Sequence, residues 1–182
     1  MVRGMLMALL VGLPVAASAQ QQPEPGSVEA RLERVEAQLA IQRIQMDYAG
    51  FLDSRDYTHY VALFTPDAEW RNAGGSHVGR EAIRKMLSMM GPEGAENRSN
   101  FHLITNSRVD VTGATTATAT SRYLFVMRGP DGAPRPSLTG IYTDDLVKQD
   151  GKWLIRRRVA NDIMPTPEEF RKIMAEQRAK QP

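Results

Sequence analysis

The most informative absence in this sequence is cysteine, which does not occur among its 182 residues. Without a thiol the chain can form no disulfide bond, no thiolate nucleophile, no thiolate zinc site and no lipid anchor at an N-terminal cysteine. Histidine is scarce, with three residues. Neither His59 nor His77 has the spacing to His102 or to a nearby carboxylate that is typical of a metal site. We therefore expect neither a metal nor a cofactor.

The sequence also lacks a strong excess of charge of either sign. It has 23 Lys and Arg residues and 21 Asp and Glu residues, which gives a formal net charge of +2. Such a balance exerts no general attraction on nucleic acid, so we expect no nucleic-acid partner. Two motifs are missing as well. Gly74-Gly75 does not match a phosphate-binding loop, and no serine stands in a nucleophile elbow.

The clearest apolar run lies at the start of the sequence and is short. Arg3 precedes an apolar stretch from Met5 to Ala17, and Ala17-Ser18-Ala19 matches a signal-peptidase site. The run is too short for a comfortable membrane span. We expect a signal peptide that is cleaved after Ala19, giving a secreted, periplasmic protein that does not contact the membrane. An uncleaved anchor is the alternative. Cleavage removes Arg3 and leaves 22 basic residues against 21 acidic residues.

The first half of the remaining chain predicts helices. A polar linker over residues 20–26 is followed by Ser27, a good N-cap, and then by apolar residues at helical spacing. We expect a long amphipathic helix from Val28 to about Asp53, in which Gly50 allows a bend. The shorter elements expected around it are helices at Tyr57–Phe64 and Gly79–Met90, a strand at Ala68–Asn72, and a charged C-terminal helix from Thr166 to about Lys180.

The second half predicts long strands. Four extended segments cover Asn100–Val111, Thr115–Arg128, Ser137–Lys148 and Lys152–Asp162. Asp150-Gly151 is a hairpin signal between the last two segments. This order predicts an α+β fold in which a curved, cone-shaped antiparallel sheet packs against three N-terminal helices. A C-terminal helix is added to it, and a pocket lies between the long first helix and the concave face of the sheet.

One segment of this predicted sheet carries a candidate catalytic group. His102 lies between Phe101, Leu103 and Ile104, so its environment is expected to be partly dry, and one neighbour can tune its proton affinity there. A half-buried histidine with satisfied hydrogen bonds is the alternative reading of the same pattern.

Several short sequence motifs occur in an order that resembles a known family. They are Tyr48 with Asp53 and Asp56, the run from Leu63 to Trp70, Gly79 to Ile83, His102 with Thr105-Asn106, and Tyr142 to Asp145 followed by Asp150 to Trp153. This pattern resembles the SnoaL-like branch of the nuclear transport factor 2-like superfamily from about Val28 to Asn161. The resemblance implies one domain of that type over residues 27–164, followed by a charged helix and tail over 165–182. It also implies a homodimer or trimer.

Within this superfamily the sequence looks most like the lyases scytalone dehydratase, bile-acid dehydratase and hexachlorocyclohexane dehydrochlorinase. Those enzymes use an Asp–His pair, and Asp53 and His102 match its positions. Tyr48 looks like a residue of the bile-acid dehydratase pattern. Ketosteroid isomerase is a poorer match, because Asn72 stands where it has a catalytic aspartate. The second catalytic histidine of scytalone dehydratase has no counterpart in the segment Thr115–Arg128.

The residue types suit proton transfer from carbon. Neutral His102 can act as a base near neutral pH, Asp53 can orient its ring, and Tyr48 can donate a hydrogen bond. The segment Arg156-Arg157-Arg158 alternates between the two faces of its strand, so either Arg157 or the other two face the pocket, and we take Arg158 as the candidate. The apolar residues expected to line a pocket, or to form ordinary core, are Trp70, Met86, Met90, Phe101, Tyr123, Phe125 and Ile141.

We therefore expect a cofactor-independent lyase or isomerase that acts on a small, hydrophobic, ring-containing molecule. His102, Asp53 and Tyr48 are its predicted catalytic residues, and Trp70, Tyr123, Arg158, Phe125 and Ile141 are predicted to bind the substrate. A periplasmic protein of the same fold that binds a small ligand without turnover is the alternative. A module whose sheet is buried in an oligomer is a third.

Overall fold

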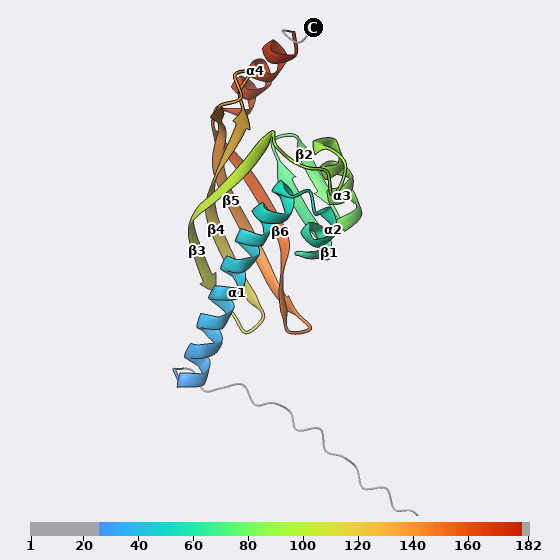
Figure 1. The fold of residues 1–182 in the computed structure, drawn as a ribbon. Helices are drawn as coiled ribbons and strands as arrows, with labels where there is room; N and C mark the ends of the chain where they lie inside the picture. Colours follow the sequence, from blue (N-terminus) through green and yellow to red (C-terminus); the bar gives the residue numbers. More distant parts are fainter. Residues whose placement is uncertain (1–25, 180–182) are drawn as a thin grey trace, which may run out of the picture.

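The computed structural model describes residues 26–179 (Figure 1). Three predicted features lie outside the described residues. They are the signal peptide over 1–19, its cleavage site, and the linker over 20–26 except for its last residue, Gly26. The same holds for the last residues of the predicted C-terminal tail. Within the described part, none of the helices has both the length and the apolar character needed to cross a membrane.

Helices α1 and α2 begin where the sequence offers a capping side chain. Helix α1 covers Val28–Asp53, and the Ser27 hydroxyl accepts a 3.1 Å bond from the Ala30 N–H. Asp56 caps helix α2 in the same way through the His59 N–H. The prediction of a single long first helix is confirmed, and the helix continues through Gly50 to its end. The remaining helices are α2 (Tyr57–Ala62), α3 (Arg80–Leu87), the short 3₁₀ turn η1 (Ser88–Met90) and α4 (Pro167–Ala179).

One six-stranded sheet holds the molecule together, with the strand order β2-β1-β6-β5-β4-β3. The α+β fold is confirmed, but the sheet is mixed, because β1 runs parallel to β6 and all other neighbours are antiparallel. The expectation of a wholly antiparallel sheet was wrong in this respect. The strands are β1 (Phe64–Asn72), β2 (Gly75–Val78), β3 (Asn100–Val111), β4 (Thr116–Arg128), β5 (Pro134–Gln149) and β6 (Lys152–Met164).

Long-range pairing explains where the predicted boundaries were wrong. Strand β1 begins at Phe64 rather than Ala68, because Phe64 pairs with Ile155 and the Ile155 N–H donates to the Leu63 carbonyl. The residues Gly75–Val78, for which the sequence predicted no strand, form β2 against the end of β1. Sequence propensity is local, so it cannot see partners that lie far away in the chain.

The helices α1, α2 and α3 cover one face of the sheet, as Figure 1 shows, and the core lies between the two layers. Along β4 the buried residues Ala117, Ala119, Ser121 and Tyr123 alternate with exposed ones, as the two-residue period of a strand requires. Small side chains near one end of β4 give way to Tyr123 and Phe125 near the other. Tyr123 and Phe125 line a cavity, which therefore lies at the end of β4 that carries the aromatic residues.

Candidate functional site

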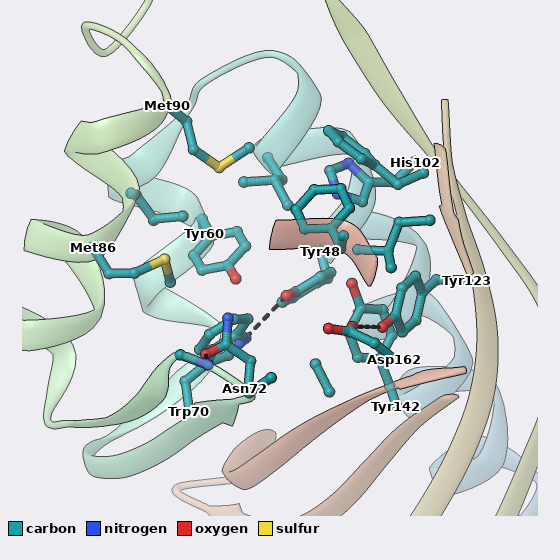
Figure 2. Close-up of a pocket in the computed structure, with 18 of the residues that line it drawn as sticks. Tyr48, Tyr60, Trp70, Asn72, Met86, Met90, His102, Tyr123, Tyr142 and Asp162 are labelled. Atoms are coloured by element: carbon teal, nitrogen blue, oxygen red, sulfur yellow. Dashed lines mark hydrogen bonds between the residues drawn. The ribbon is translucent and has the colours of Figure 1, made fainter. Parts of the chain in front are cut away.

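A cavity of about 400 Å³ lies between the helices and the inner face of the sheet. This volume is within the range of small-molecule sites in proteins. Figure 2 shows its side chains converging from α1, α2, α3 and the sheet. Its lining is mostly apolar or aromatic and is formed by Tyr48, Leu52, Tyr60, Trp70, Asn72, Ala73, Gly74, Met86, Leu87, Met90, His102, Tyr123, Phe125, Leu138, Tyr142, Ala160, Asp162, Phe170 and Arg171.

The structure brings Asp53 and His102 together. The Oδ1 atom of Asp53 lies 2.7 Å from Nδ1 of His102, and its Oδ2 atom accepts a 2.8 Å bond from the His102 backbone N–H. This second bond is available because β3 is an edge strand, and an N–H that points away from β4 has no partner in the sheet. Asp53 is the last residue of α1, so the end of the helix places its carboxylate beside β3.

The two contacts orient the imidazole ring. A carboxylate accepts hydrogen bonds, so the bond assigns the proton of neutral His102 to Nδ1 and leaves Nε2 as the basic atom. The ring also packs on Phe125, with the centroids 4.7 Å apart. The side chain of His102 is 9% exposed and that of Asp53 is 24% exposed. His102 lines the cavity and Asp53 does not, so the carboxylate supports the ring from behind.

Tyr48 points from α1 into the cavity, on a different side of the helix from Asp53. Its hydroxyl accepts a 3.0 Å bond from Nε1 of Trp70, which leaves its own proton free to be donated. Its ring packs against that of Tyr60, with the centroids 4.8 Å apart. The Tyr60 hydroxyl is buried and has no hydrogen-bond partner among the described residues. The cavity thus contains two phenol groups with spare hydrogen-bonding capacity.

Arg158 does not line the cavity, which corrects the expectation that it binds substrate. Its guanidinium donates bonds of 2.6 and 2.7 Å to the two carboxylate oxygens of Asp144, and both side chains are 1% exposed. The rings of Tyr48 and Tyr142 cover it, with centroids 3.9 and 4.7 Å from the guanidinium carbon. Burial would lower the pKa of Arg158, but the Asp144 carboxylate outweighs this and raises it.

The strand period explains two further corrections. Ile141 lies between the buried residues Gly140 and Tyr142 on β5, so its side chain is on the outer face of the sheet and not in the cavity. Phe101 precedes His102 on β3, and it is 41% exposed on the outer face for the same reason. Trp70, Tyr123 and Phe125, the other residues predicted to bind substrate, do line the cavity.

Sequence reasoning missed Asp162, the acidic residue of the cavity wall. Its Oδ1 atom accepts a hydrogen bond from the Tyr123 hydroxyl, a contact drawn in Figure 2. Gly140 lies between the two residues, on β5, in register with both. A glycine in the middle of a long strand marks a close approach of other groups, and this was the signal available in the sequence.

Tyr60, Tyr123 and Tyr142 are held in their neutral form. Burial raises the pKa of Tyr60 and of Tyr142 well above the usual value, despite the opposing effect of Arg158. Burial, followed by the hydrogen bond to Asp162, raises the pKa of Tyr123. These phenols can therefore donate hydrogen bonds at any ordinary pH. No cluster of three or more potential metal-binding side chains occurs among residues 26–179.

Comparison with known proteins finds relatives of this chain. Over 146 residues the sequence is 24% identical to gamma-hexachlorocyclohexane dehydrochlorinase from Sphingobium indicum, a match that covers 75% of this chain and 86% of that protein. A candidate scytalone dehydratase from Novosphingobium aromaticivorans has 29% identity and a TM-score of 0.62, covering 74% of this chain and 89% of that chain.

Other solved structures show the fold. A nuclear transport factor 2-like protein with a cystatin-like fold, from Novosphingobium aromaticivorans, has a TM-score of 0.68 at 19% identity. That match covers 79% of this chain and 95% of the other. The model of the SnoaL-like domain matches residues 33–159, which include both Asp53 and His102. The chain therefore belongs to the SnoaL-like domain family.

Proposed function

We propose that this protein is a cofactor-independent lyase or isomerase that moves a proton from carbon in a small, hydrophobic, ring-containing molecule. The observation that carries the proposal is the 2.7 Å contact between Asp53 and Nδ1 of His102, with His102 in the wall of the cavity. His102 is the proposed base, Asp53 is the proposed orienting group, and Tyr48 is the proposed hydrogen-bond donor.

The proposed chemistry follows from the orientation of the ring. Nε2 of His102 takes a proton from a carbon next to a carbonyl group, and Asp53 stabilises the imidazolium that forms. The Tyr48 hydroxyl donates to the oxygen on which negative charge develops. In an elimination of water, the imidazolium returns the proton to the departing hydroxyl group. The C–H and C–O bonds break, a C=C bond and an O–H bond form, and His102 is neutral again.

The relatives support this class of reaction. One is a dehydrochlorinase and another is a candidate dehydratase. Both names describe eliminations, in which a proton leaves carbon together with a leaving group. An isomerase would use the same first step and return the proton to a different carbon.

The test follows the proton itself and needs no leaving group. Tetralone is a bicyclic ketone, and NMR in D₂O can follow the exchange of the hydrogens next to its carbonyl group. We expect the wild-type protein to accelerate this exchange. We expect His102→Gln to slow it about 10²- to 10⁴-fold, the usual contribution of a positioned base. His59→Gln, at an exposed position outside the cavity, is the matched control and should exchange at the wild-type rate. Equal rates in all three proteins would contradict the proposal.

A binding protein without turnover is the second candidate, and the apolar lining of the cavity favours it equally. A hydrophobic molecule would be held there whether or not His102 reacts. Tetralone that binds by calorimetry but exchanges at the rate seen without protein would support this second candidate. Tetralone that binds and exchanges would support the enzyme.

A further inference from the structure

Three residues that lie side by side on the neighbouring strands β4, β5 and β6 place a hydrogen-bonded pair of polar side chains in the wall of the cavity. Tyr123 pairs with Gly140, and Gly140 pairs with Asp162. A β-carbon at Gly140 would collide with the phenol of Tyr123 and with the backbone carbonyl of Asn161. The absence of a side chain therefore lets the Tyr123 ring cross over β5 and donate its proton to Oδ1 of Asp162.

The other carboxylate oxygen of Asp162 is left for a ligand. No hydrogen bond or ion pair joins Oδ2 to another residue of the described chain, although Asp162 lines a mostly apolar cavity. Removal of a carboxylate from water is costly unless its oxygens accept hydrogen bonds. When a molecule fills the cavity and displaces water, Oδ2 needs a donor from that molecule.

A second polar group lies on the other side of the cavity. The Tyr60 ring is fully buried, and its hydroxyl has no partner among the described residues. Figure 2 shows this hydroxyl on the left wall and Asp162 on the right, with the Tyr48 hydroxyl between them. Because its pKa is raised by burial, the Tyr60 phenol keeps its proton and can donate it to an oxygen of the ligand.

We infer that the ligand is a hydroxylated ring compound whose hydroxyl group donates to Asp162 and whose carbonyl oxygen accepts from Tyr60. A chlorinated ring is disfavoured as a ligand, because chlorine cannot donate a hydrogen bond to the free oxygen of Asp162. The inference rests on the proposed function for the location of the ligand. It goes further by naming the two polar groups that the ligand carries and the residues that bind them.

Binding measurements with four matched probes test this selectivity. Calorimetry would compare tetralin, chlorotetralin, tetralol and tetralone, which share one bicyclic frame. We expect the wild-type protein to bind tetralol about tenfold or more tightly than chlorotetralin, as a hydrogen bond to a charged group allows. In Asp162→Asn the preference should fall to less than about threefold, because a neutral amide holds the hydroxyl group less firmly and no longer repels chlorine.

Two controls keep the test decisive. Asp145 pairs with Arg157 and not with a cavity residue, so Asp145→Asn should keep the wild-type preference. Tyr123→Phe frees both oxygens of Asp162, so the preference for tetralol should be at least as large as in the wild type. This second variant still tests the idea if Asp162→Asn does not fold. Equal affinity for tetralol and chlorotetralin in the wild type, or no binding of any probe, would overturn the inference.

The same probes separate this inference from the proposed function. Selectivity between an alcohol and a chloride is a property of binding, so His102→Gln should retain it. A wild-type protein that prefers tetralol but does not accelerate the exchange in tetralone would contradict the proposed enzyme and support the ligand class. A wild-type protein that accelerates the exchange but shows no preference for tetralol would support the proposed enzyme and contradict the ligand class.

Discussion

The structure contains two Asp–His pairs with nearly the same local geometry. In one, Asp53 lies 2.7 Å from Nδ1 of His102 and accepts its backbone N–H at 2.8 Å. In the other, Asp56 lies 2.6 Å from Nδ1 of His59 and accepts its backbone N–H at 3.1 Å. The exposed fraction of the histidine side chain distinguishes them, at 9% for His102 and 66% for His59.

This difference teaches that an Asp–His contact alone does not make a reactive site. The Asp56–His59 pair lies at the surface, where water screens the charges, and its main effect is to cap the short helix α2. In the Asp53–His102 pair the imidazole ring stands in the cavity wall, with Phe125 against one face of the ring and Asp53 behind it. Electrostatic interactions are stronger in such an environment, and a ligand can reach the ring there.

The largest expected effect comes from replacing the aspartate of each pair, one at a time, by asparagine. Asp53→Asn should slow the exchange of tetralone hydrogens about 10²- to 10⁴-fold, because an amide no longer fixes the ring tautomer or stabilises the imidazolium. Asp56→Asn makes the same chemical change at the exposed pair and should leave the rate unchanged. NMR exchange rates of both variants would be compared after circular dichroism has shown that they are folded. A slower rate in Asp56→Asn would show that the exposed pair also contributes to the reaction.

A third pair, between Asp144 and Arg158, extends the comparison to two side chains that are both fully buried. Arg158→Ala should lower the free energy of unfolding by about 3 to 5 kcal/mol, because it leaves a buried carboxylate without its partner. Arg157→Ala is the matched control on the same strand. Arg157 is half-exposed and bonds to Glu69 at 3.0 Å, so its loss should cost much less. Urea unfolding of both variants gives the two values, and equal losses would show that burial does not decide the strength of the pair.

These pairs also show which features can be predicted from the sequence. Asp53 and His102 were predicted because the end of a periodic helix and the start of an alternating strand are local patterns, and the family resemblance placed them side by side. The helix order and the four long strands followed from the same kind of pattern. The parallel pairing of β1 with β6 did not, since it joins residues far apart in the chain.

The rest of the site could not be predicted from the sequence, because it depends on strand register and on burial. The choice among Arg156, Arg157 and Arg158 depends on strand parity, and even the correct parity would not show that Tyr48 and Tyr142 cover Arg158. Ile141 and Phe101 were placed in the cavity by their apolar character, although a shift of one residue turns a side chain to the other face. Asp162 was missed because its partner Tyr123 lies two strands away, across Gly140.

A smaller effect sharpens the contrast between buried and exposed ionisable groups. Burial raises the pKa of Tyr60 and Tyr142, and burial with the Asp162 bond raises that of Tyr123. Below about pH 10 these phenols are protonated in both the folded and the unfolded chain. Above that pH the unfolded chain loses protons that the folded chain keeps, so the free energy of unfolding falls by about 1.4 kcal/mol per pH unit for each tyrosine. Urea unfolding at alkaline pH measures the slope, which should be shallower by one tyrosine in Tyr60→Phe. An unchanged slope would contradict the buried state of that phenol.

The smallest effect belongs to the exposed pair and has the opposite dependence on pH. The backbone N–H of His59, and then its ring, lower the pKa of Asp56 below the usual value near 4. The carboxylate therefore stabilises the folded protein above that pH, and this contribution is lost as the pH falls below it. Asp56→Ala should lower the Tm by about 2 to 4 °C at neutral pH, as the loss of a helix cap does, and the difference from the wild type should shrink in acid. Thermal unfolding at both pH values checks this. Because neither Asp56 nor His59 lines the cavity, tetralone exchange should not change in this variant. A parallel loss of exchange would mean that the surface pair supports the site after all.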